Sequence, residues 1–242
     1  MGPSVGAATR RRQAQNRRPG LQGCGPNPTP DVDPTVPDLY LERIRRALGV
    51  GTRRILGLAG PPGGGKSTLA QALQHAFGAR AVVVPMDGFH LANVELQRLG
   101  RAGRKGAPDT FDAAGYVALL RRLRTPVGGE TVYAPAFRRE IEEPVAGAIA
   151  VPADVPLVIT EGNYLLMDDG PWAGVRALLD EAWYVAGDDD LRRARLIARH
   201  MAFGRDADAA RDWVAQTDEP NALRIAATAA RADLVFRWDA PG

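Results

Sequence analysis

Short apolar runs alternate along this chain with longer segments in which apolar residues recur every three or four positions. The short runs predict buried strands at residues 55–59, 81–84, 157–160, 182–185 and 234–236. The longer segments predict amphipathic helices around residues 39–48, 69–77, 113–124, 189–202, 207–215 and 221–231. Because strands that alternate with helices build a parallel sheet with helices on its faces, we expect an α/β fold.

The first 37 residues lack this pattern and are rich in proline and arginine. We therefore expect a disordered arm at 1–37 and a single domain over 38–242. The five arginines of the arm oppose only Asp31 and Asp33, which accounts for the whole net charge of +3, so the domain is formally neutral. An arginine-rich arm can touch nucleic acid or acidic partners, but such termini are usually just disordered, and nucleic acid is not the partner we expect.

The overall composition, 45% hydrophobic and 24% charged, is ordinary for a soluble globular domain. No apolar run approaches the ~20 residues that span a bilayer, and the arginine-rich start is not followed by the apolar stretch of a secretory signal. Cys24 is the single cysteine and cannot form an internal disulfide, which fits a reducing cytoplasm. We expect a cytoplasmic protein without a membrane partner, and the composition leaves a homodimer open.

A phosphate-binding motif, G-x-x-x-x-G-K-[ST], occupies Gly60–Ser67 between a predicted strand and a predicted helix. Its backbone N–H groups can wrap a phosphate at the positive end of the helix dipole. We expect Lys66 to reach the β- and γ-phosphates of ATP and the Ser67 hydroxyl to bind Mg²⁺. The other predicted nucleotide contacts are Gly60, Pro61, Gly63, Gly64, Gly65 and Thr68. The alternative is a glycine-rich turn that binds nothing. Such a turn would not need a strand directly before it and a helix directly after it. The expected fold is thus a P-loop NTPase with a small lid and hairpin region.

Two carboxylates follow predicted strands, at the edge of an α/β sheet where ligands bind. Asp87 comes after the strand at 81–84, where it can take the proton of a substrate hydroxyl or help to hold Mg²⁺. Its alternative is a turn aspartate ahead of Gly88. Glu161 closes the strand at 157–160 and suits the Mg²⁺ site, because glutamate is rarely buried without a partner.

Three arginines, Arg192, Arg195 and Arg199, are spaced to share one face of the predicted helix at 189–202. Such a stripe could close over a triphosphate and stabilise the charge that spreads during phosphoryl transfer. The alternative is a solvated face on which Asp188 pairs with Arg192. The spacing alone does not separate the two.

Four segments together resemble the superfamily of uridine kinases and bacterial pantothenate kinases: Gly60–Ser67, Met86–Phe89, Arg104–Asp112 and Glu161–Tyr164. The most similar branch is that of the bacterial nucleoside/nucleotide kinase-like proteins, which includes fructose transport system kinases. The resemblance covers about residues 40–240. It implies ATP- and Mg²⁺-dependent transfer to a hydroxyl, with Asp87 as the catalytic base. It also implies that Ser67 and Glu161 are metal ligands and that Arg195 or Arg199 is a lid arginine.

The resemblance does not identify the molecule that accepts the phosphate. Residues 133–144 resemble the substrate-side hairpin of the family but lack the histidine of the uridine kinase motif Y-D-F-x-x-H. His90 stands where uridine kinases have tyrosine. These two departures weaken a uridine assignment. In the most similar branch an aspartate is usual near Arg138, which indicates a changed polar contact. Lysine occurs only at positions 66 and 105, both in the predicted site. The candidate acceptor contacts are His90, Lys105, Arg139, Asn163 and Tyr164, each of which could equally be a surface or hairpin residue.

We therefore expect an ATP-dependent kinase that phosphorylates a hydroxyl of a sugar, a nucleoside or a pantothenate-like alcohol. The alternative is a P-loop ATP-binding sensor or accessory protein without metabolite kinase activity, and acceptor-dependent ADP formation separates the two. A third hypothesis, an enzyme linked to nucleic acid through its arm, predicts salt-dependent binding that is lost on deletion of residues 1–37.

Overall fold

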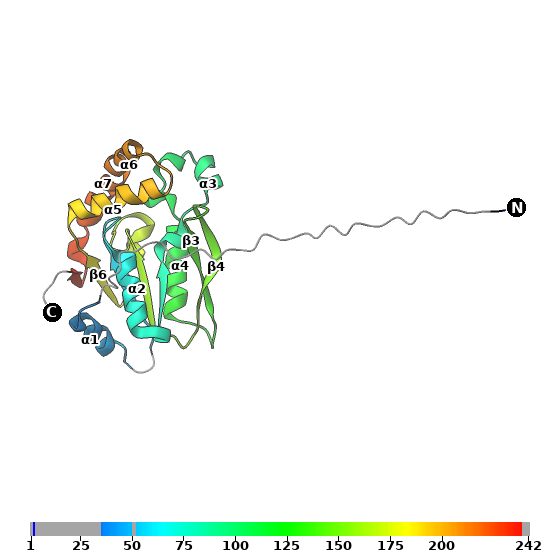
Figure 1. Cartoon of the computed structure of the whole chain (residues 1–242). Coiled ribbons are helices and arrows are strands. Elements are labelled where there is room, and N and C mark those ends of the chain that lie inside the picture. Colours follow the sequence, from blue (N-terminus) through cyan, green and yellow to red (C-terminus); the bar gives the residue numbers. More distant parts are fainter. Residues whose placement is uncertain (1, 3–34, 50–51, 239–242) are drawn as a thin grey trace. The chain divides into compact units, whose positions relative to one another are not determined.

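Five strands form one parallel sheet in the part of the chain that the structure, a computed structural model, describes: residue 2, residues 35–49 and residues 52–238. The predicted arm at 1–37 lies almost wholly outside these residues. The strand order is β2-β5-β1-β6-β7. Figure 1 shows the strands packed among helices, with β6 labelled. The bounds are β1 Arg54–Ala59, β2 Ala81–Pro85, β5 Leu157–Gly162, β6 Glu181–Val185 and β7 Leu234–Phe236. All neighbouring strands run parallel, which confirms the α/β class and all five predicted strands.

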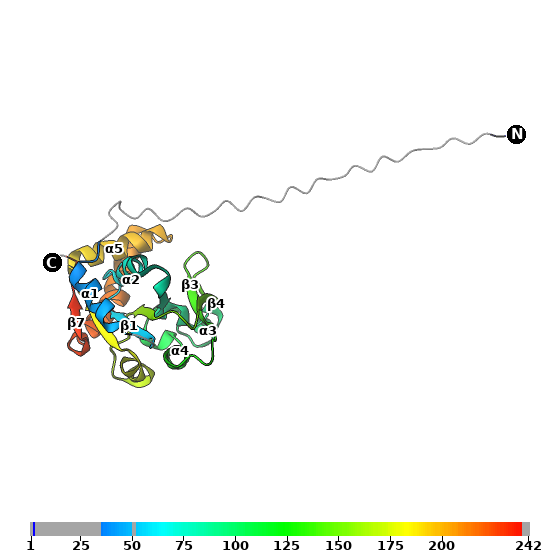
Figure 2. The same cartoon turned by 90° about the horizontal axis from the view of Figure 1, so that it is seen from below.

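Both faces of the sheet are buried, which explains why its strands read as continuous apolar runs. Leu56 and Leu58 of β1 pack on one face with helices α1 (Asp38–Ala47) and α2 (Lys66–Phe77). Ile55 and Ala59 pack on the other face with α4 (Ala113–Arg124). Figure 2 shows α1 and α2 on one side of the sheet and α4 on the other. The alternation along β1 follows from the period of two in a strand.

Three strands end at the same level of the sheet. In the parallel register Glu161 of β5 lies opposite Leu58 of β1 on one side and Pro85 of β2 on the other. The loop after β1 and the turn after β2 therefore begin beside the last residues of β5. This register brings the phosphate-binding motif, Asp87 and Glu161 to one edge of the sheet.

A separate antiparallel hairpin is formed by β3 (Val132–Arg138) and β4 (Glu143–Val151), which contains the hairpin predicted from resemblance at 133–144. Its register shifts between Ala134 and Ala136, so Pro135 lies at an irregularity in the ladder. The Pro135 carbonyl approaches Gly88, where a Cβ atom would come within 2.3 Å of the oxygen. The hairpin is thus pressed against the turn that carries Asp87.

The remaining helices are α3 (Asn93–Arg98), α5 (Asp189–Ala202), α6 (Ala207–Trp213) and α7 (Glu219–Ala226). The bounds of α4 and α5 agree with the prediction, whereas α3 was not predicted. The predicted boundary between the last two helices was wrong, because a π-helical turn, Val214–Asp218, joins α6 directly to α7. Within the described residues, no helix combines the length and the apolar character that crossing a membrane requires.

Candidate active site

The phosphate-binding loop connects β1 to α2 and ends in an open helix start. Gly63 and Gly65 have φ of 75° and 86°, a left-handed conformation that favours glycine. Gly65 precedes α2, and no side chain caps the first turn of this helix. The first backbone N–H groups of α2 therefore lack intrahelical partners and can bind an anion. The predicted nucleotide contacts in this loop and first turn are Gly60, Pro61, Gly63, Gly64, Gly65, Lys66, Ser67 and Thr68.

Lys66 is buried at the start of α2. Its Nζ donates to the Pro61 carbonyl over 2.9 Å and to Asn163 Oδ1 over 2.8 Å. Burial lowers the pKa of Lys66 to about 8, against the opposing attraction of Glu161 and Asp87. Two of its three N–H groups are thus used to hold the side chain in place, and the third can be donated to a phosphate oxygen.

Ser67 and Glu161 form the second part of the site. The Ser67 hydroxyl donates to Glu161 Oε1 over 3.0 Å. Burial of Glu161 raises the pKa of its carboxyl, and the negative charge of Asp87 raises it further. A divalent cation would offset both effects, and hydroxyl and carboxylate oxygens are the donors that Mg²⁺ prefers, so these residues fit the metal.

No cluster of three His, Cys, Asp or Glu side chains suited to a metal occurs among the residues that the structure describes. A magnesium site in a phosphate-transferring enzyme does not require such a cluster, because one or two protein oxygens hold Mg²⁺ there and its other ligands are phosphates and water.

Asp87 follows β2 in a short 3₁₀ turn, Met86–Phe89. The side chain of Met86 is fully buried, and the Asp87 carbonyl accepts hydrogen bonds from both the backbone N–H and Nδ1 of His90. These contacts fix the backbone of Asp87. Its carboxylate is 32% exposed, and Oδ2 lies 3.5 Å from Arg139 Nη2. Asp87 therefore joins Lys66 and Glu161 at one edge of the sheet while its carboxylate stays accessible to a bound molecule.

Three of the predicted acceptor contacts lie around one ring, Phe137. The His90 ring centroid is 4.7 Å from that of Phe137 and 4.0 Å from that of Phe111. Lys105 Nζ lies 5.0 Å and the Arg139 guanidinium 5.8 Å from the Phe137 centroid. Burial lowers the pKa of His90, so its ring is neutral at pH 7. These three side chains and Phe137 thus form one cluster, in which Arg139 contacts Asp87.

The other two predicted acceptor contacts lie elsewhere. Asn163 binds Lys66, so it supports the phosphate-binding loop. Tyr164 is fully buried, and its hydroxyl donates to the carbonyl of Gly106. Tyr164 is a core residue that positions the segment at 104–112, and we leave it out of the acceptor contacts.

The arginines of α5 differ in their surroundings. Arg192 is buried, pairs with Asp189 and Glu219, and leaves Nη1 without a partner among the described residues. Arg199 is half-buried, and its pKa is lowered by burial and by the positive charge of Arg139. Arg195 is exposed. The alternative considered for Arg192, a pair with Asp188, does not occur in the described part of the chain. Arg192 pairs with Asp189 and Glu219, and Asp188 caps the helix.

Arg192 was predicted to belong to the arginine stripe, but only Arg195 and Arg199 were predicted as lid arginines. The carbonyl and side chain of Arg192 lie against Gly63 of the phosphate-binding loop. The spacing of the arginines could have indicated that Arg192 lies beside Arg199. Residues seven apart on a helix differ by about 20° around its axis, whereas residues three apart differ by about 60°. Arg192 and Arg199 thus share a direction more closely than either does with Arg195.

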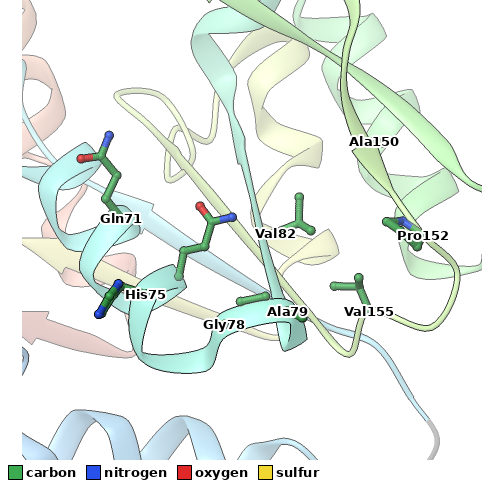
Figure 3. Close-up of a pocket in the computed structure, with 10 residues that line it drawn as sticks. Gln71, His75, Gly78, Ala79, Val82, Ala150, Pro152 and Val155 are labelled. Carbon is green, nitrogen blue, oxygen red and sulfur yellow. The ribbon is translucent and has the colours of Figure 1, made fainter. Parts of the chain in front are cut away.

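A hollow of about 650 Å³ on the described surface lies away from this site (Figure 3). Gln71, His75, Val82 and Pro152 contribute to its lining, so it is bounded by the carboxyl-terminal half of α2, by β2 and by the segment after β4. Because α2 is 12 residues long, or about 18 Å at 1.5 Å per residue, its carboxyl-terminal end is far from Lys66. This hollow is therefore separate from the candidate active site.

Comparison with known proteins agrees with the geometry. The model of the "Phosphoribulokinase / Uridine kinase family" matches residues 55–238. Protein YggC of Escherichia coli (strain K12) is 34% identical over 211 residues, or 85% of this chain and 86% of YggC. "Putative uridine kinase C227.14" of Schizosaccharomyces pombe (strain 972) is 38% identical over 184 residues, or 72% of this chain and 77% of that protein.

A solved structure shows the same relationship. The crystal structure of a "putative fructose transport system kinase from Silicibacter sp. TM1040" superposes with a TM-score of 0.75 at 36% sequence identity, covering 82% of this chain and 97% of that one. The family match spans well over half of the chain and includes every predicted site residue. The fold is that of a P-loop kinase, and the chain belongs to the phosphoribulokinase / uridine kinase family.

Proposed function

We propose that this chain uses ATP and Mg²⁺ to phosphorylate a hydroxyl group of a small molecule, and that residues 38–242 form the kinase domain. The observation that carries the proposal is the meeting of Lys66, the Ser67–Glu161 pair and Asp87 at the ends of three adjacent strands. A lysine for phosphates, oxygens for a cation and a carboxylate that can take a proton are the groups that phosphoryl transfer to a hydroxyl requires.

The residues around the phosphates bind and orient them. The first N–H groups of α2 bind the β-phosphate, and Lys66 donates to the oxygens of the β- and γ-phosphates. Ser67 and Glu161 would hold Mg²⁺, which when bound draws negative charge away from the phosphates. Arg199, from α5, stabilises the charge that develops on the γ-phosphate.

Asp87 is the proposed base. Its carboxylate accepts the proton of the acceptor hydroxyl as the hydroxyl oxygen forms a bond to the γ-phosphorus. The bond between that phosphorus and the β–γ bridging oxygen breaks, and ADP leaves with the electron pair. The contacts of the Asp87 carbonyl with His90 support this role, because they fix the backbone that carries the carboxylate.

The names of relatives define a first set of acceptors. They include a putative uridine kinase, a putative fructose transport system kinase and pantothenate kinases. Uridine, fructose and pantothenate all carry a free hydroxyl group. We propose that this chain takes an acceptor with such a hydroxyl.

ADP release from Mg·ATP tests the proposal, with fructose, uridine, cytidine, pantothenate and glycerate as acceptors. We expect at least one acceptor to raise ADP formation in the wild-type chain and none to do so in Lys66→Ala. If the protein binds ATP but no acceptor raises ADP formation, the proposal fails and an ATP-binding sensor becomes the better account.

A further inference from the structure

Arg139 lies beside the proposed base with most of its hydrogen-bonding capacity unused. Its Nη2 is 3.5 Å from Asp87 Oδ2, and no other ion pair or side-chain hydrogen bond of Arg139 occurs among the described residues. A guanidinium carries five N–H donors, and 3.5 Å is the outer limit of a hydrogen bond. The side chain is 44% exposed, so the spare donors are accessible to a bound molecule.

Two other contacts between an arginine and a carboxylate are equally long, Arg101–Asp109 and Arg124–Asp180, but each of those arginines also donates to a backbone carbonyl. Arg98 holds Glu95 with bonds of 2.6 and 2.8 Å, and Arg176 holds Asp233 with bonds of 2.7 and 2.9 Å. Both pairs are short, and the Arg98 pair has the two parallel bonds that a guanidinium and a carboxylate prefer. Arg139 faces a carboxylate without adopting that geometry.

The end of the hairpin that carries Arg139 is anchored. Lys105 Nζ donates to Asn93 Oδ1 over 2.7 Å and to the carbonyl of Glu142. Glu142 has φ of 52°, the only left-handed conformation of a non-glycine residue in the described part of the chain. The Arg139 guanidinium in addition lies against the Phe137 ring. The backbone beside Arg139 is thus held in one conformation by groups that have no other evident task.

Proton transfer removes the negative charge that faces Arg139. When Asp87 takes the proton of the hydroxyl, its carboxylate becomes neutral, and Asp87 is the only carboxylate that pairs with Arg139 among the described residues. Arg199 is a second cation nearby, since the charge of Arg139 contributes to lowering its pKa, and it has no ion pair among the described residues. A negative group on the acceptor itself would pair with the guanidinium before and after proton transfer.

We propose that the acceptor carries an anionic group, a carboxylate or a phosphate, which Arg139 binds while Asp87 receives the hydroxyl proton. This inference rests on the proposed function and specifies its substrate class. The competing role for Arg139 is a contact with the γ-phosphate of ATP. The two roles differ in one measurable respect, because a γ-phosphate contact would serve every acceptor equally.

Matched pairs of acids and neutral analogues test the inference on the full chain. The carboxylate arm compares glycerate with glycerol and pantothenate with pantothenyl alcohol. The phosphate arm compares fructose 6-phosphate with fructose and uridine 5′-phosphate with uridine. Each pair is assayed for kcat/KM at constant ionic strength in the wild type, in Arg139→Met and in Arg139→Lys. Arg121→Met, on the exposed surface of α4, is the control variant.

We expect one acid to exceed its neutral partner by about 30-fold or more in the wild type and in Arg121→Met. Arg139→Met should bring the acid to within about threefold of its neutral partner assayed in the same variant, while Arg139→Lys keeps part of the preference. The inference is overturned if the favoured acceptor is neutral, or if Arg139→Met slows both members of a pair equally. Either result leaves the kinase activity itself intact.

Absence of turnover with all eight compounds would count against the proposed function and still permit a decision on Arg139. The same pairs are then tested by thermal denaturation in the presence of Mg²⁺ and a non-hydrolysable ATP analogue. A rise in the melting temperature with an acid, absent with its neutral partner and absent in Arg139→Met, supports the anion site. No such rise with any acid overturns it.

Discussion

The hydroxyl of Ser67 and the carboxylate of Glu161 meet over 3.0 Å although 94 residues separate them along the chain. The parallel pairing of β1 with β5 produces this contact, because Glu161, the last residue but one of β5, lies opposite Leu58 and α2 follows the loop after β1. An oxygen pair at the start of a phosphate-binding helix is the arrangement that a magnesium ion between protein and phosphates requires.

Glu161→Gln tests this pair. The substitution keeps the shape of the side chain and removes its charge, so we expect Mg²⁺ affinity to fall by about 10- to 100-fold, the range found for groups that support a metal. A Mg²⁺ titration of ADP formation measures the change. Glu130→Gln, which alters an exposed pair with Arg122, is the control and should leave the titration unchanged. Equal Mg²⁺ dependence in Glu161→Gln and wild type would contradict the metal assignment.

Proton uptake on ATP binding tests Lys66. Its pKa is lowered to about 8 without ATP, and phosphates favour its charged form, so binding raises this pKa. Below about pH 7 the side chain is charged in both states and takes up no proton. Above pH 8 it is largely neutral before binding, so uptake should approach one proton at about pH 9 and ATP affinity should fall with rising pH.

Isothermal titration in two buffers that differ in ionisation enthalpy gives this proton count. Lys66→Met should remove the pH dependence of the uptake. A proton count in the wild-type chain that does not change between about pH 7 and pH 9 would show that Lys66 is not the group that responds to the phosphates.

Two arginines of α5 provide a matched comparison. Arg199 is half-buried near Lys66, to whose lowered pKa it contributes, whereas Arg195 is exposed. We expect Arg199→Ala to lower kcat by about 100-fold or more, since it removes a group that stabilises the transition state. Arg195→Ala should stay within about threefold of the wild type, as expected for an exposed position. Comparable losses in both variants would refute the orientation of α5 described above.

The contact between Gly88 and Pro135 should limit stability. A Cβ atom at Gly88 would lie 2.3 Å from the Pro135 carbonyl oxygen, so Gly88→Ala must displace the hairpin. We expect a loss of about 1–3 kcal/mol in the free energy of unfolding, measured by urea denaturation. Gly103→Ala is the control, because nothing lies within 4 Å of its Cβ position, and it should change stability by less than about 1 kcal/mol. Equal stability of the two variants would argue against a close hairpin contact.

The sheet was predictable because its local signals and its tertiary environment agree. The apolar runs of β1 and β5 lie in a sheet covered on both faces, so hydrophobicity alone marks them. The limits of α4 were predictable because Asp112 is an N-cap residue by type and accepts a hydrogen bond from the Gly115 N–H. The first helix was harder, since Leu39 reads as apolar yet is 55% exposed while Tyr40 and Leu41 are buried.

The active site was predictable as far as residue type and strand ends specify chemistry. Lys66 and Ser67 belong to a motif of fixed spacing, and the strand order brings Glu161 beside them. The side chains of Tyr164 and Arg195 could not be placed in this way. Whether a tyrosine after a strand enters the core depends on a partner 58 residues away, the Gly106 carbonyl. The direction of an arginine on a helix depends on how the whole helix packs.

The destination of the γ-phosphate of ATP tests the central claim most directly. With γ-labelled ATP and an acceptor that raises ADP formation, we predict that the label appears in a phosphate ester of that acceptor. Asp87→Asn should still bind ATP and should slow ester formation by about 100- to 10,000-fold, the contribution of a general base. Label found only as inorganic phosphate, or ester formed at the wild-type rate by Asp87→Asn, would contradict a kinase in which Asp87 takes the hydroxyl proton.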